Sequence, residues 1–160
     1  MPAIDDIELA LVIHVLAVVH WIGGVAFVTL VALPLSMSCA NAKAGWALFE
    51  SVENRFAAQV RVSIPLAGLS GLWMTWRLGL WGMFLDPSSW WMGAMVVVWT
   101  LFAGIVFVVE PLAHARIAAV AARDPAGLLR RLARAHYVLL AAAAVTVIGA
   151  VAGSHGGLLG

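Results

Sequence analysis

The sequence predicts an all-α integral membrane protein, a four-helix bundle with both termini on the outer (periplasmic) side. Its 160 residues are 64% hydrophobic and only 11% charged. A soluble domain is instead about 45–50% apolar and about 25% charged. Four stretches are apolar over the ~20 residues that a helix needs to cross a bilayer. Eight of the nine Lys and Arg residues lie in or beside the two connections that share one side of such a bundle.

The predicted spans belong to a single transmembrane domain that takes up the whole chain, residues 1–160. They cover residues 7–35, 58–81, 90–110 and 135–153. Pro34 lies near the end of the first span, and Glu110 with Pro111 ends the third. Proline has no backbone N–H and cannot continue a regular helix, so it is expected near span ends.

An amphipathic helix is predicted for residues 44–57, between the first two spans. Trp46, Phe49 and Phe56 recur at spacings of three and seven, which places them on one face of a helix. Glu50 and Glu53 are assigned to the other faces. This helix is expected on the cytoplasmic side, leading directly into the second span.

The orientation follows from the basic residues, which favour cytoplasmic loops. The first connection carries Lys43 and Arg55, with Arg61 at its edge, whereas only Arg77 lies beside the second connection. The third connection carries five arginines: Arg116, Arg123, Arg130, Arg131 and Arg134. The chain is therefore expected to be a multi-pass protein of the bacterial inner (cytoplasmic) membrane.

Several function classes have no support in the sequence. The net charge of +1 does not indicate a nucleic-acid partner. The single cysteine, Cys39, excludes an intrachain disulfide and any cysteine-based zinc or iron–sulfur cage. The motifs of serine hydrolases, zinc proteases and phosphate-binding loops are absent from the sequence.

The first span carries the candidate cofactor-binding residues His14, His20, Trp21, Gly23 and Gly24. An imidazole in hydrocarbon needs a partner, and neutral imidazole is a common metal ligand. The two histidines are ~9 Å apart along a helix and ~120° apart around it, so they cannot ligate one porphyrin from opposite sides. Each needs a partner from another helix. The glycines share the face of His20, where they would either pack helices closely or give a flat cofactor room.

Depth in the membrane suggests the partners. His14 and Met95 lie ~10 Å and ~8 Å from the outer ends of their spans, and His155 lies at the outer end of the last span. The candidate metal ligands are therefore His14, Met95, His20 and His155. His/Met and His/His pairs are known haem ligands. Methionine is also a common filler of apolar space, which is the alternative for Met95.

A second set of histidines lies at the cytoplasmic ends of the third and fourth spans. His114 and His136 are close to the aqueous interface there, where an imidazole costs little. They are the less favoured ligand candidates, as a pair with Glu110.

His14, followed seven residues later by Trp21-Ile22-Gly23-Gly24, resembles the first-helix signature of the copper-resistance D (CopD) membrane family. It is also similar to that of the HemJ-type protoporphyrinogen oxidases, whose first helix carries a histidine and then a Trp-Phe-x-Gly element. The resemblance is specific over residues 12–27 and architectural elsewhere. The HemJ-type proteins imply haem b with His14 as a ligand. Their essential lysine would fall near Met95, but the one lysine here is Lys43.

The sequence favours three functional hypotheses. The leading hypothesis is a haem b-binding protein with a redox or electron-transfer role, and a membrane haem oxidoreductase if it is an enzyme. The CopD resemblance implies copper transport or delivery as the alternative, with Met37 and Cys39 as soft ligands. The third is a cofactor-free accessory subunit of a membrane complex, with its histidines bonded to carbonyls or serines of other helices. Expected partners are membrane lipid, a quinone or a periplasmic redox protein, and a second copy of the chain.

Overall fold

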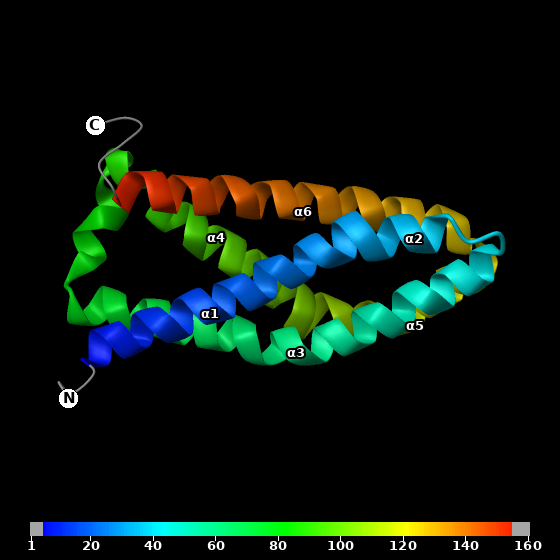
Figure 1. The fold of residues 1–160 in the computed structure, drawn as a ribbon, viewed down its shortest axis with the longest axis horizontal. Helices are drawn as coiled ribbons and strands as arrows, with labels where there is room; N and C mark the ends of the chain where they lie inside the picture. Colours follow the sequence, from blue (N-terminus) through cyan, green and yellow to red (C-terminus); the bar gives the residue numbers. More distant parts are fainter. Residues whose placement is uncertain (1–4, 155–160) are drawn as a thin grey trace.

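The computed structural model describes residues 5–154, which form helices and no strand (Figure 1). These helices make four long rods. In chain order the rods are α1 (Asp6–Phe27) with η1 (Val28–Ala32) and α2 (Leu33–Met37); α3 (Ala42–Arg77); α4 (Trp90–Gly104) with η4 (Ile105–Val109) and α5 (Glu110–Arg123); and α6 (Pro125–Ser154). Between α3 and α4 lie the short 3₁₀ helices η2 (Leu80–Leu85) and η3 (Pro87–Ser89).

The rods lie side by side and run up and down the bundle, so the described ends of the chain lie at the same end of the bundle (Figure 1). α1 packs most extensively along α3, and α4 packs along α6. α6 also contacts α1 and α3, and α3 contacts α4, which leaves α1 and α4 diagonally opposite.

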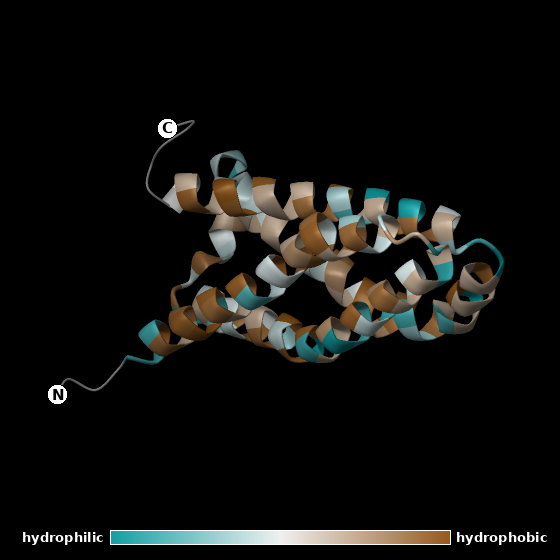
Figure 2. Ribbon diagram, turned by 45° about the vertical axis from the view of Figure 1, so that its right-hand side comes forward, coloured by the Kyte–Doolittle hydropathy of each residue, from teal (hydrophilic) through white to brown (hydrophobic). Residues whose placement is uncertain are grey.

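Three segments are long and apolar enough to cross a membrane: Asp6–Met37, Pro87–Arg123 and Pro125–Gly153. The chain is therefore a helical membrane protein. α3 is equally long at 36 residues, but its first half carries most of its charged residues. Figure 2 shows hydrophilic residues along the half of the bundle that lies away from the termini. We call this half, which holds Arg116, Arg123, Arg130, Arg131 and Arg134, the arginine-rich end.

Both prolines that the sequence placed near span ends interrupt the regular helix. η1 and η4 are single π-helical turns, and each ends two residues before a proline, Pro34 or Pro111. A proline ring clashes with the carbonyl four residues earlier, which here belongs to Leu30 or Phe107 inside the π turn. The wider π turn relieves that clash without ending the rod.

Residues 44–57 do not form a separate helix. They are the first part of α3, which continues without a break through Pro65 to Arg77. Asn41 caps its start by accepting a hydrogen bond from the Lys43 N–H at 2.9 Å. Gly79, with φ of 65°, reverses the chain just after its end.

The interior is filled by two hydrophobic clusters. The first centres on Trp21, Ile64 and Phe102, with the Trp21 and Phe102 rings edge to face at 5.0 Å. The second lies nearer the arginine-rich end and centres on Leu33, Phe49 and Leu129. Phe56 of α3 packs against both clusters.

Tryptophans of α4 lie over glycines of the neighbouring helices. Trp99 covers Gly68 of α3 and donates its indole N–H to the Ile64 carbonyl at 2.8 Å. Trp90 lies over Gly149 of α6. The small residues therefore let a large ring settle between two helices, as expected for helix contacts inside a membrane.

The prediction that both Gly23 and Gly24 face the bundle interior holds only for Gly24. A Cβ atom on Gly24 would overlap the Phe56 ring, whereas a Cβ on Gly23 would meet nothing within 4 Å. Consecutive helical residues point about 100° apart, so two adjacent residues cannot both point at the same neighbour. Gly23 is exposed on the outer surface of α1.

These two glycines provide a matched test of the packing. Gly24→Leu is expected to destabilise the fold by about 1–3 kcal/mol, because the Phe56 ring must leave both clusters. Gly23→Leu is expected to change stability by less than about 0.5 kcal/mol. Thermal unfolding of the detergent-solubilised protein measures both. Equal effects of the two substitutions would contradict the α1–α3 packing.

Candidate functional site

The two intramembrane histidines hold α1 against α3. His14 donates its Nδ1–H to the Ala67 carbonyl at 2.8 Å, because a carbonyl oxygen can only accept. His20 pairs with two α3 side chains: its Nδ1 lies 3.2 Å from Ser63 Oγ, and its Nε2 lies 3.1 Å from Gln59 Oε1. These are the interhelical hydrogen bonds that a cofactor-free bundle would contain.

The fit of a haem differs between the predicted ligands. His14 is half-buried, and its Nδ1 bond fixes the tautomer in which Nε2 carries the free lone pair, as in many metal-bound histidines. His20 is exposed, and both its ring nitrogens have partners. Met95 is half-buried on α4, diagonally across the bundle from α1. His155 lies outside the described residues.

The predicted copper ligands lie near the arginine-rich end. Met37 is exposed at the end of α2, and the Cys39 thiol lies 3.6 Å from the Leu35 carbonyl, which accepts from it. Within residues 5–154, no three His, Cys, Asp or Glu side chains gather closely enough to hold a metal ion.

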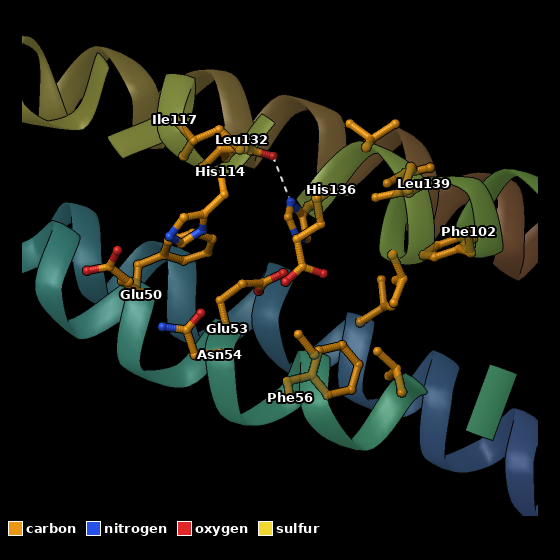
Figure 3. Close-up of a pocket in the computed structure, with 18 of the residues that line it drawn as sticks. Glu50, Glu53, Asn54, Phe56, Phe102, His114, Ile117, Leu132, His136 and Leu139 are labelled. Carbon is orange, nitrogen blue, oxygen red and sulfur yellow. Dashed lines mark hydrogen bonds between the residues drawn. The ribbon is translucent and has the colours of Figure 1, made fainter. Parts of the chain in front are cut away.

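The structure contains a cavity of about 250 Å³ inside the arginine-rich half of the bundle (Figure 3). It extends from Trp21 of α1 and Phe102 of α4 toward Glu50 of α3 and His114 of α5. Five aromatic side chains line it: Trp21, Trp46, Phe49, Phe56 and Phe102. We call it the inner cavity.

The charged groups of the inner cavity are all acidic. Glu50, Glu53 and Glu110 line it together with His114 and His136, and no lysine or arginine of the described chain does so. Figure 3 shows Glu53 reaching from α3 into the space below His136. Because Glu110 forms an ion pair with Arg61, the net negative charge of the cavity comes from Glu50 and Glu53.

Two of these groups already have partners. Glu110 forms an ion pair with Arg61 of α3 at 3.2 Å. His136 donates its Nδ1–H to the Leu132 carbonyl of its own helix at 2.9 Å, which leaves Nε2 as the free nitrogen (Figure 3).

Two buried polar atoms of the inner cavity lack a hydrogen bond to the described residues. They are Oε2 of Glu53 and Nε1 of Trp21. Buried polar atoms are rarely unpaired, because desolvation without a new hydrogen bond costs about 1–3 kcal/mol. One is a hydrogen-bond acceptor and the other is a donor.

Glu53 lies on the same face of α3 as Phe49 and Phe56, and the prediction that it takes another face is wrong. Glu53 follows Phe49 by four residues and precedes Phe56 by three, so all three lie on one stripe of α3. The structure buries that stripe against α6 and the cavity. A carboxylate at a core position of an amphipathic helix was the signal that could have identified it. Of the residues predicted to bind a cofactor, Trp21 lines the inner cavity; His20 and Gly24 line a different groove.

Comparison with known proteins finds no matching family model, no matching curated protein and no matching solved structure. The resemblance of residues 12–27 to the CopD and HemJ groups therefore stays a prediction.

Burial raises the pKa of the Glu53 carboxyl above its ordinary value of 4.5, and Glu110 raises it further, although His136 opposes both. A raised pKa means that the folded state prefers the protonated form. The resulting stabilisation is complete below pH 4.5 and is lost as the pH rises through the folded-state pKa.

Glu53→Gln is therefore expected to raise the melting temperature at neutral pH and to flatten its decline as the pH rises above 4.5. Melting curves across that range measure the effect. Glu8→Gln is the control, because Glu8 is exposed at the start of α1, far from Glu53. A wild-type decline that Glu53→Gln leaves unchanged would show that Glu53 is not buried as described.

Proposed function

We propose that this chain is a membrane protein that binds a small organic cation in the inner cavity. The observation that carries the proposal is the Glu53 carboxylate at the wall of an aromatic cavity, whose Oε2 atom is buried and has no hydrogen bond to the described residues. A cationic ligand would neutralise this charge, whereas an anion would be repelled by Glu50 and Glu53.

The aromatic residues favour the same ligand class. Tryptophan and phenylalanine faces attract cations by ~0.5–2 kcal/mol, most strongly where water is excluded. The Trp21 N–H at the far end of the cavity has no hydrogen-bond acceptor among the described residues, and an oxygen atom of the ligand would supply one. The ligand class is therefore an amine or quaternary ammonium with an apolar body that carries an oxygen. The volume of about 250 Å³ favours a ligand smaller than a typical drug.

The proposal includes an orientation in the membrane. We propose that α3 completes a set of four spans and that both termini lie on the periplasmic side of a bacterial inner membrane. The support is the positive-inside rule, because eight of the nine basic residues lie toward the arginine-rich end. In this orientation the inner cavity is reached from the cytoplasm.

Calorimetric titration of the purified protein with benzyltrimethylammonium tests the ligand class, and benzenesulfonate is the anion of similar size. Binding of the cation alone is expected. Glu53→Gln should weaken it roughly tenfold or more, since opposite charges about 4 Å apart attract each other by about 4 kcal/mol where the effective dielectric constant is about 20. Glu8→Gln should have no effect. Equal binding of the sulfonate, or full affinity in Glu53→Gln, would contradict the proposal.

The same quaternary ammonium tests the orientation, because it does not cross membranes. Inverted vesicles, which expose the cytoplasmic face, are expected to bind it, and right-side-out vesicles are not. The opposite result would reverse the orientation and leave the cavity intact.

A second candidate function is the haem b redox protein that the sequence predicts. The observation that favours it is the His14 bond to the Ala67 carbonyl, which leaves Nε2 available as an axial ligand. Met95, or His155 beyond the described residues, is proposed as the second ligand. Bound haem b would supply one-electron transfer, with a quinone or a periplasmic redox protein as the proposed partner.

An absorbance spectrum of the purified protein tests this second candidate. A Soret band with sharp reduced α and β bands is expected if the protein supplies both axial ligands. His14→Ala should remove most of the haem, Met95→Ala should shift the spectrum, and His114→Ala should do neither. Full haem content with an unchanged spectrum in His14→Ala would contradict the assignment of His14.

A further inference from the structure

A second hollow lies on the outside of the bundle, in the groove between α1 and α3. It measures about 380 Å³, and Arg55, Gln59, His20, Gly24 and Phe27 lie along it. Phe56 lines both this lateral groove and the inner cavity, so its ring separates the two. Gly24 lets the Phe56 ring lie directly against α1, because a Cβ atom on residue 24 would overlap that ring.

The height of the groove follows from an ion pair at the other end of the bundle. Arg77 donates two hydrogen bonds, of 2.7 and 3.0 Å, to the Asp6 carboxylate, and the Trp73 indole N–H donates a third. Charged and tryptophan side chains together mark a membrane interface. Phe27 follows Asp6 by 21 residues, which is ~32 Å of helix and close to the ~30 Å thickness of the hydrocarbon layer.

Arg55 therefore lies at the level of the opposite headgroups. Gln59 lies one turn deeper, where its amide contacts both His20 and the Arg55 carbonyl. Above the groove the outer surfaces of the two helices are apolar, with Val19 and Val62 both exposed. The groove thus has a polar end at headgroup level and an apolar continuation along the bilayer.

The charge of the groove is opposite to that of the inner cavity. Arg55 is its one charged residue, and Arg55 forms no ion pair with any described residue. Guanidinium groups bind phosphate through paired hydrogen bonds. No carboxylate lines the groove to attract an ammonium headgroup. These features favour a phosphate whose headgroup carries no cation.

We propose that the lateral groove is a binding site for an anionic phospholipid such as phosphatidylglycerol. Arg55 binds the phosphate, Gln59 and His20 lie at the level of the glycerol esters, and the acyl chains run along α1 and α3. This proposal is independent of the cation and haem proposals. It requires only that the bundle crosses a bilayer.

Native mass spectrometry of the full chain in detergent, titrated with dioleoylphosphatidylglycerol, tests the site. The wild type is expected to bind this lipid more tightly than dioleoylphosphatidylcholine or dioleoylglycerol. Arg55→Gln should weaken binding about fivefold, the effect expected from one basic residue at the membrane surface. Arg116→Gln, an exposed arginine on α5 that lines neither hollow, should leave the affinity unchanged.

Two further measurements separate the site from its alternatives. Arg55→Lys, which keeps the charge but loses the paired hydrogen bonds of the guanidinium, should bind more tightly than Arg55→Gln and less tightly than the wild type. Melting curves should show that the variants are folded. Inorganic phosphate at millimolar concentration should not displace the lipid. The proposal is overturned if Arg55→Gln and Arg116→Gln bind equally well, or if free phosphate displaces the lipid completely.

Discussion

The contact between α1 and α3 sets the register on which both hollows depend. It is held at three heights by polar contacts: the Asp6–Arg77 ion pair, the His14–Ala67 hydrogen bond and the bonds of His20 to Ser63 and Gln59. Inside a membrane, polar contacts between helices replace the hydrophobic driving force that water supplies elsewhere. This register brings Gly24 to Phe56, and the position of that ring divides the inner cavity from the lateral groove.

The two hollows have opposite charge because of where neighbouring residues of α3 point. Glu53 and Arg55 are two positions apart, which is about 200° around a helix, so one faces the interior and the other faces outward. The interior wall is therefore acidic and aromatic, and the outer wall is basic. A buried carboxylate attracts cations strongly because little water screens it. An arginine at the membrane surface is attracted to lipid phosphates, because anionic lipids make that surface negative.

The length of the rods explains why polar groups collect at one end. α3 has 36 residues, or ~54 Å of helix, so it is far longer than the ~30 Å hydrocarbon layer. In the proposed arrangement of four spans, the excess emerges at the arginine-rich end, where His114, His136 and the carboxylates line the inner cavity. At the deep end of that cavity Trp21 and Phe102 pack edge to face, at a level that the depth of α1 places inside the bilayer.

The sequence by itself determined the helical fold class and three of the four apolar segments that it predicted to cross a membrane, because long apolar stretches depend only on composition and order. It also singled out His14 and His20 as polar groups that need partners. Only the tertiary structure decided what those partners are. The Ala67 carbonyl is a backbone group, which no residue pattern marks. It lies beside His14, 53 residues away in the chain, only because of the register between α1 and α3. Glu53 became a buried acid for the same reason, since α6 covers the stripe of α3 that its spacing shares with Phe49 and Phe56.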